Sequence, residues 1–241
     1  MDLHKITFEA RGASFTGHLA DGSHGRAVPG ILVAHESGGL DANTLLRTRM
    51  LGELGYVALA VDLFGEAPGD LERMRAHTRA LVANRPLLRE IMGAGLGVLA
   101  EHPSVDRSKL GAIGFCFGGF AALELARTGA DLRCIVGFHS GLFPGNPEEA
   151  NSIRAKVLIC LGAADPVVGA DQREAFAAEM SAAGTDWQLI LYGGVGHSFT
   201  NRGIDAYDMP GFAYDEMADR RSWQAMRALF DETFGPSGDS G

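Results

Sequence analysis

Cysteine and positive charge are both scarce in this sequence. Three cysteines are too few for a disulfide framework, and Cys134 and Cys160 lie inside apolar runs, where buried inert thiols are common. Acidic residues outnumber basic ones by 30 to 21, which gives a net charge of −9. A net acidic surface repels phosphate backbones, so we expect no binding to nucleic acid. The sparse, unpaired cysteines are typical of a reducing compartment.

Long apolar runs are missing as well. No apolar stretch reaches the length of a membrane-spanning helix. The first ten residues lack the charged start and apolar core of a signal peptide. We therefore expect a cytoplasmic protein that does not bind a membrane.

Spacings typical of metal or dinucleotide binding are also missing. No pair or triplet of His, Cys, Asp or Glu shows a metal-ligand spacing. Glycines 93, 95 and 97 fall inside a stretch with helical spacing, whereas a dinucleotide motif follows a strand. His35 and His139 each end an apolar run, and we expect both to be structural. The sequence predicts neither a metal nor a cofactor.

The sequence does contain short apolar runs that alternate with longer segments of helical spacing. Runs without polar alternation are typical of parallel strands covered on both faces; they lie at 31–35, 56–62, 110–115, 134–139, 157–162 and 187–192. Helical spacing occupies 43–54, 70–100, 117–127, 169–183 and 217–234, and 70–100 has room for one helix and a loop or for two helices. This alternation predicts an α/β fold with a mainly parallel, doubly wound sheet.

The two ends of the chain differ from this pattern. Residues 6–19 alternate loosely and contain two glycines, which predicts an N-terminal antiparallel hairpin. The last residues, 235–241, are rich in Gly, Ser and Pro, and we expect a flexible tail there. No repeat or linker divides the rest, so we expect a single domain over 1–234.

The segment G-F-C-F-G-G lies between a predicted strand and a predicted helix. It matches the G-x-S-x-G nucleophile elbow with Cys116 in place of serine. Such a sharp turn strains the backbone at the nucleophile and leaves no space for side chains at positions 114 and 118, which are both glycine here. The following helix N-terminus favours a thiolate. The alternative is a buried cysteine in a glycine-rich turn.

Two further segments carry residues suited to nucleophilic catalysis. Asp165 follows the apolar run at 157–162, and His197 follows the run at 187–192. The ends of parallel strands meet at one edge of a sheet, so we expect both side chains near Cys116. The order nucleophile, acid, histidine favours Asp165 over Asp62, which also follows a run. Asp165 as a turn residue and His197 as a surface loop residue remain the alternatives.

With these residues in place, the chain resembles the dienelactone hydrolase family of the α/β-hydrolase superfamily. The resemblance extends over nearly the whole chain and rests on V-A-H-E-S-G-G (33–39), A-V-D-L-F-G (60–65), G-F-C-F-G-G (114–119), G-A-A-D-P (162–166) and G-H-S-F (196–199). It implies an α/β-hydrolase fold. It also implies that Cys116 is the nucleophile, His197 the general base and acid, and Asp165 the residue that orients the imidazole.

The resemblance implies three further roles near the nucleophile. Glu36 corresponds to a glutamate that holds the resting thiol and takes its proton when substrate binds, a role that a desolvated carboxylate with a raised pKa can fill. The alternative is that Glu36 only bonds loop backbone. The backbone N–H groups of Phe117 and Ser37 correspond to the oxyanion hole.

The family also holds a substrate carboxylate between two arginines. The first corresponds to Arg75, although Arg73, Arg75 and Arg79 are equally compatible with a solvated helix face. The second lies four residues after the catalytic histidine, where this chain has Asn201, followed by Arg202. This departure leaves the family's own substrate open.

Together these observations predict a monomeric or homodimeric hydrolase that cleaves a small ester or lactone through a thioester at Cys116. A general carboxylesterase or thioesterase acting on neutral acyl groups is the nearest alternative. A non-catalytic binding protein on the same scaffold, or a thiol redox sensor that uses Cys116, belongs to another class.

Overall fold

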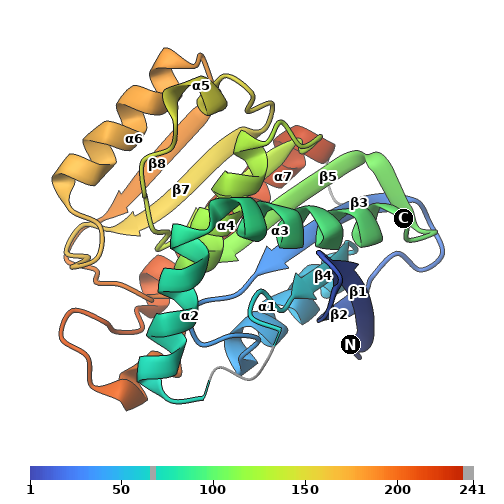
Figure 1. Cartoon of the computed structure of the whole chain (residues 1–241), viewed down its shortest axis with the longest axis horizontal. Coiled ribbons are helices and arrows are strands. Elements are labelled where there is room, and N and C mark those ends of the chain that lie inside the picture. Colours follow the sequence, from blue (N-terminus) through green and yellow to red (C-terminus); the bar gives the residue numbers. More distant parts are fainter. Residues whose placement is uncertain (66–68, 236–241) are drawn as a thin grey trace.

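The computed structural model describes residues 1–65 and 69–235, and its centre is one sheet (Figure 1). The strand order is β1-β2-β4-β3-β5-β6-β7-β8, and every pairing from β4 to β8 is parallel. The strands are β1 (His4–Ala10), β2 (Ala13–Asp21), β3 (Val28–Ala34), β4 (Val57–Val61), β5 (Val105–Phe115), β6 (Cys134–Phe138), β7 (Lys156–Gly162) and β8 (Trp187–Tyr192). The predicted doubly wound α/β architecture is confirmed.

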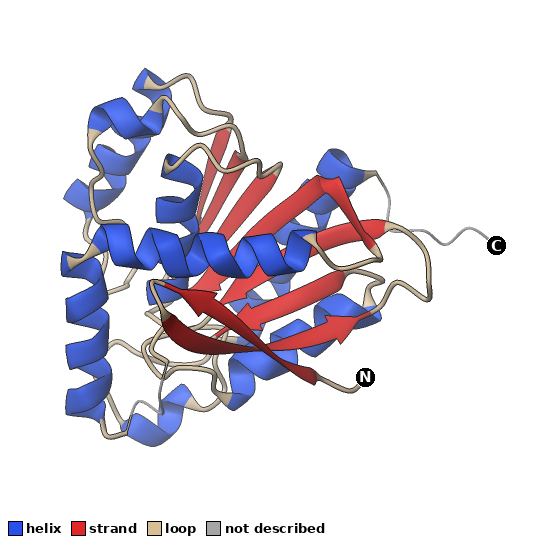
Figure 2. Cartoon of the chain, turned by 45° about the vertical axis from the view of Figure 1, so that its right-hand side comes forward, coloured by secondary structure: helices blue, strands red, loops and turns tan. Residues whose placement is uncertain are grey.

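The N-terminal hairpin is present as predicted. β1 and β2 pair antiparallel with Phe8 opposite Phe15, and β2 continues antiparallel onto β4. The two phenylalanine rings stack and cover the helix side of this edge, whereas the alternate residues face solvent. Figure 2 shows the twisted hairpin at one edge of the sheet.

Helices cover both faces, which explains why the central strands lack polar alternation. In Figure 1, α3 and α4 cross in front of the sheet and α7 lies behind it. All five residues of β4 and of β6 are buried. The helices are α1 (Ala42–Glu53), α2 (Leu71–Ala83), α3 (Arg85–Ala100), α4 (Phe117–Arg127), α5 (Pro147–Ala150), α6 (Ala170–Ala182) and α7 (Glu216–Phe234).

The segment 70–100 forms two helices, the second of the two arrangements that its length allowed. Asn84 ends α2 outside helical geometry, and its side chain accepts a hydrogen bond from Leu87 N at the start of α3. Pro86 lies in the first turn of α3, where its missing N–H costs nothing. The break turns α2 away from the sheet, so that α2 stands over the strand ends that carry the site.

Two short elements were not predicted: α5 and a 3-10 helix at Ile204–Tyr207. Each has four residues, which is too short for a hydrophobic period. The predicted tail lies outside the described residues from position 236 onward. Within the described residues, no helix combines the length and apolarity needed to cross a membrane.

Candidate active site

Cys116 lies at the turn between β5 and α4. Its backbone has φ 52° and ψ −114°, a strained conformation for a residue with a side chain. A Cβ at Gly114 would lie 2.0 Å from Gly118 O, and one at Gly118 would lie 2.1 Å from Ala34 O, so neither position accepts a side chain. Cys116 N donates to Phe138 O at 2.9 Å, which anchors the turn to β6. The predicted elbow geometry is present.

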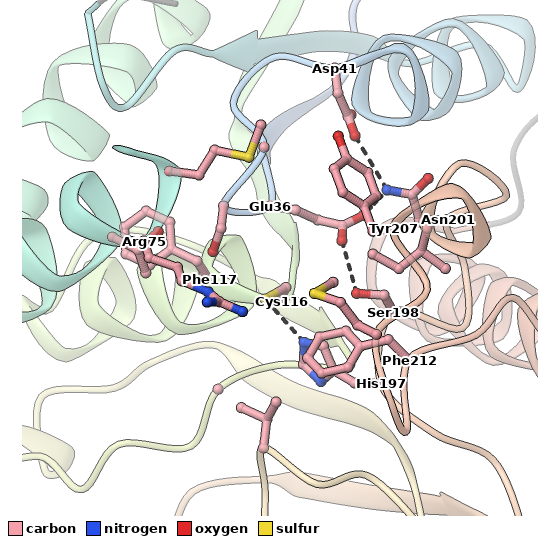
Figure 3. A pocket seen from close by; sticks show the side chains of 18 of the residues that line it. Glu36, Asp41, Arg75, Cys116, Phe117, His197, Ser198, Asn201, Tyr207 and Phe212 are labelled. Atoms are coloured by element: carbon pink, nitrogen blue, oxygen red, sulfur yellow. Dashed lines mark hydrogen bonds between the residues drawn. The ribbon is translucent and has the colours of Figure 1, made fainter. Parts of the chain in front are cut away.

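The loops after β7 and β8 bring an acid and an imidazole to the same strand ends. His197 Nδ1 donates to Asp165 Oδ2 at 2.7 Å, and His197 Nε2 lies 3.1 Å from Cys116 Sγ (Figure 3). The other oxygen of Asp165 accepts from Val167 N and Val168 N, which fixes the carboxylate. The structure thus brings the three predicted triad residues together in the order thiol, imidazole, carboxylate.

The imidazole of His197 is buried between the Cys116 sulfur and the Asp165 carboxyl group. Burial alone disfavours its charged form, but the Cys116 sulfur and the hydrogen bond to Asp165 outweigh burial and raise the pKa of His197 to about 10. A protonated ring beside the sulfur can stabilise negative charge that develops there. This pairing gives the site a nucleophile and, on the same ring, a proton for a leaving group.

The other candidate acid and histidines have structural contacts. Asp62 accepts hydrogen bonds from Phe64 N and Gly65 N in the loop after β4. His35 donates from Nδ1 to the Glu36 carbonyl and accepts from Leu63 N at Nε2, so its prediction as a structural histidine is confirmed.

His139 is only partly satisfied. Its Nε2 is 2.8 Å from Thr200 Oγ1, but its buried Nδ1 has no hydrogen-bond partner among the described residues. Burial and the neighbouring His197 hold the pKa of His139 well below its usual range. A neutral His139 ring therefore packs edge-on against His197 at a centroid distance of 5.3 Å.

Glu36 lies beside the triad but its carboxylate bonds other groups. Oε1 accepts from Asn43 Nδ2 at 3.2 Å and from Asn201 Nδ2 at 3.0 Å, and Oε2 accepts from Ser198 Oγ at 3.1 Å. The thiol of Cys116 instead contacts His197. The expected contact between Glu36 and the resting thiol is therefore absent from this arrangement. The role of Glu36 as a proton relay stays a prediction.

The titration of Glu36 leads to a stability prediction. Burial, and then the nearby Asp41, raise the pKa of Glu36 to about 7, opposed by His197 and two hydrogen bonds. Between pH 4.5 and 7 the folded protein holds a proton that the unfolded chain has released, so the free energy of unfolding falls as pH rises. We expect the wild-type protein to lose about 2 kcal/mol more than Glu36→Gln between pH 5 and pH 8. Urea unfolding at both pH values measures this, and parallel pH dependences would contradict it.

The site opens into a cavity of about 280 Å³ with a largely apolar wall. Cys116, His197 and Glu36 line it, and so do both residues predicted to supply the oxyanion hole, Ser37 and Phe117. The N–H of Phe117 belongs to the first turn of α4, where helix geometry leaves backbone donors without an intrahelical partner. The apolar side chains on the wall are Met74, Phe143, Val167, Ile204, Tyr207, Met209 and Phe212.

The three residues predicted to bind substrate have different surroundings. Arg75, on α2, lines the cavity. Asn201 also lines it, but its amide donates to Glu36 and to Asp41. Arg202 is exposed, stands over the Tyr214 ring at 5.1 Å and is not part of the cavity wall. The structure thus does not bring Arg202 to this cavity, and its contact with substrate stays a prediction.

Several residues of the site were not predicted from the sequence. Arg47 Nη2 bonds both carboxylate oxygens of Asp219 and also Thr200 O, which holds the loop that follows His197. His197 forms a bridge with Phe212, whose ring packs edge-on against the imidazole at 4.8 Å. These partners lie far apart in the chain, and no local pattern indicates them.

This sheet, with a strained nucleophile turn after β5 and an acid and a histidine after later strands, defines an α/β-hydrolase fold. The dienelactone hydrolase family model matches residues 15–234, and the chain belongs to that family. It is a hydrolase that acts on carboxylic esters or lactones.

Three relatives illustrate the similarity. The solved structure of m3DLH is 43% identical with a TM-score of 0.93, covering 97% of this chain and 98% of that one. A dienelactone hydrolase-like promiscuous phosphotriesterase from metagenomic libraries is 38% identical with a TM-score of 0.91, covering 98% and 100%. The carboxymethylenebutenolidase of Pseudomonas putida is 27% identical over 205 residues, covering 80% of this chain and 86% of that protein.

Proposed function

We propose that this protein cleaves a small ester or lactone through a thioester formed at Cys116. The observation that carries the proposal is the distance of 3.1 Å from Cys116 Sγ to His197 Nε2, with Asp165 at 2.7 Å on the other ring nitrogen. The sulfur faces a cavity that can enclose a small acyl compound. A thiol in direct contact with an imidazole that can take its proton is the arrangement that nucleophilic acyl transfer needs.

The first half of the reaction forms the acyl-enzyme. The Cys116 thiolate adds to the substrate carbonyl carbon, and the carbonyl electron pair moves to oxygen, where the N–H groups of Phe117 and Ser37 stabilise it. When the tetrahedral intermediate collapses, the C–O bond breaks and the imidazolium of His197 gives its proton to the leaving oxygen. The products are an alcohol and a thioester. In a lactone, the alcohol stays attached to the acyl group.

The second half releases the acid. Neutral His197 takes a proton from water, hydroxide adds to the thioester carbon, and the thiolate leaves again as the better leaving group. Asp165 keeps the ring oriented and stabilises its positive charge in both halves. The same preference for expelling sulfur makes amides poor substrates, because attack by a thiolate on an amide returns to starting materials.

Detection of the acyl-enzyme tests the proposal directly. When a slow aryl ester is mixed with the protein and quenched in acid, we expect intact mass spectrometry to show one added acyl group. Peptide mapping should place it on the peptide that contains Cys116, and hydroxylamine should remove it as expected for a thioester. An acyl group on another residue, or turnover that never labels Cys116 even under rapid quenching, would refute the proposal.

Aryl phosphotriesters are a second candidate class of substrate. The relative described as a promiscuous phosphotriesterase is similar to this chain over nearly its full length. A thiolate beside two N–H donors and an apolar cavity suits a neutral phosphoryl centre as well as a carbonyl, because both develop negative charge on oxygen. Release of nitrophenolate from diethyl 4-nitrophenyl phosphate should then depend on Cys116. Unchanged release by Cys116→Ala would exclude this class.

A further inference from the structure

Asn201 has no hydrogen-bond donor left for a substrate. Its Nδ2 donates to Glu36 Oε1 at 3.0 Å and to Asp41 Oδ2 at 3.3 Å, and its Oδ1 accepts from Gly203 N at 2.9 Å. One amide group is therefore shared between two carboxylates (Figure 3). Both N–H bonds of this amide are used, so Asn201 has no donor for a substrate carboxylate.

The two carboxylates differ in how many donors they receive. Both oxygens of Glu36 are bonded, to Asn43, Asn201 and Ser198. Asp41 caps α1, and its Oδ1 accepts from Thr44 N and Thr44 Oγ1, each at 2.8 Å. Among the residues that the structure describes, Asp41 Oδ2 accepts only from the Asn201 amide, so an acceptor site remains on it.

All of these hydrogen bonds come from uncharged groups, so they share the negative charge without neutralising it, and the nearby His197 ring offsets part of it at Glu36. Glu36 and Asp41 both line the cavity that contains Cys116. The raised pKa of Glu36, to which Asp41 contributes, is consistent with this crowding of like charges. A third anion placed here would be repelled by Asp41, and also by Glu36 above its raised pKa of about 7, and would find no free donor on Asn201.

We propose that this part of the cavity, which we call the acidic end and define as Glu36, Asp41 and Asn201, selects substrates by charge. It accepts a substrate group that is uncharged or donates a hydrogen bond, such as a hydroxyl or an ammonium, and it excludes a carboxylate. Asn201 contributes to this selectivity because its neutral amide bonds both carboxylates. A cationic side chain at this position would instead attract an anionic substrate group. The inference rests on the proposed function, since it concerns the same cavity.

Arg75 is the counterpart at another part of the wall. It reaches the cavity from α2, and Figure 3 shows it on the opposite side of Cys116 from Asn201 and Asp41. The guanidinium can therefore receive an anionic group only when that group points away from the acidic end. A substrate with one carboxylate can bind in one orientation, and a substrate with carboxylates on both arms cannot bind well.

The test compares matched 4-nitrophenyl and alkyl esters in two series, with the substituent on the acyl arm or on the alcohol arm. Within each series, the substituted arm has one fixed length and ends in methyl, hydroxyl, ammonium or carboxylate. The value of kcat/KM is measured for each ester at constant ionic strength. In one of the two series we expect the carboxylate to be the poorest substrate for the wild-type protein. In that series Asp41→Asn should raise the carboxylate-to-methyl ratio about five- to tenfold and lower the ammonium-to-methyl ratio by a similar factor.

The variants are chosen to keep the fold. Asparagine caps a helix about as well as aspartate, so Asp41→Asn should retain α1. Asp215→Asn is the matched control, because Asp215 caps α7 in the same way and does not line the cavity. Its ratios should equal those of the wild-type protein.

The possible outcomes separate the two ideas. If Asp41→Asn changes the ratios less than twofold in both series while the methyl esters are turned over, charge selection at the acidic end is wrong and the hydrolase mechanism stands. If the Asp215→Asn control shifts the ratios equally, the effect is one of overall charge and the inference is also wrong. If no methyl ester is cleaved in a Cys116-dependent way, both proposals fail.

Discussion

Replacing Cys116 by alanine is expected to lower kcat for a neutral aryl ester by about a thousandfold or more, because no other group can take over as nucleophile. The neighbours of the sulfur within the triad are an imidazole, which serves as acid and base, and, beyond it, the carboxylate that bonds the imidazole. The activity that remains would come from substrate binding and oxyanion stabilisation, without covalent chemistry. Steady-state release of 4-nitrophenolate measures the effect.

Two further substitutions sharpen this experiment. Cys116→Ser should retain some activity but much less than the wild-type protein, because a hydroxyl is far less acidic than a thiol and does not form a stable ion pair with His197. Cys134→Ala removes a thiol that is fully buried on the other face of the sheet and is the matched control. Full activity of Cys116→Ala, or equal losses in both alanine variants, would show that the reaction does not use this sulfur.

The three triad residues could be predicted because topology alone places them. In a parallel sheet every strand ends at the same edge, so a residue just after β5, β7 or β8 must come to that edge whatever the loop conformation. Glycines at 114 and 118 then reveal the sharp turn, because the structure leaves no volume for a Cβ at either position. The prediction needed the order of elements and one local motif.

Loop geometry could not be predicted in the same way. The segment from β8 to α7 has no period, so the side toward which Asn201 or Arg202 points depends on a turn closed by Asn201 N–H to Ser198 O and by Gly203 N–H to the Asn201 side chain. The sequence shows an asparagine next to an arginine at the expected distance from His197. It does not show that two carboxylates from a distant segment use both hydrogens of that amide.

The Arg47–Asp219 pair illustrates the same limit for stability. The two residues are 172 positions apart, and each looks like an ordinary polar residue on the outer face of a helix. In the fold they are almost enclosed, with side-chain exposures of 6% and 11%, and they join α1 to α7. Charges that are buried together can be recognised only after the helices have been placed in space.

Replacing Arg47 by alanine is therefore expected to reduce the free energy of unfolding by about 3–5 kcal/mol, because it leaves the Asp219 carboxylate buried without its cation. For a chain of this size that loss lowers the melting temperature by roughly 10 °C. Arg11→Ala is the matched control: its ion pair with Glu90 is exposed, and such pairs contribute little to stability. Thermal unfolding followed by circular dichroism measures both.

The double variant Arg47→Met/Asp219→Leu distinguishes two causes of the stability loss in Arg47→Ala: a buried carboxylate without its cation, and lost packing. Apolar side chains of similar size need no partner, so the double variant should be more stable than Arg47→Ala and close to the wild-type protein. Its activity should still be lower, because Arg47 also donates to Thr200 O at 2.7 Å and so fixes the loop that carries His197. A double variant that is as unstable as the single one would show that the arginine acts through packing against Trp223, 5.4 Å from its guanidinium carbon, and not through its charge.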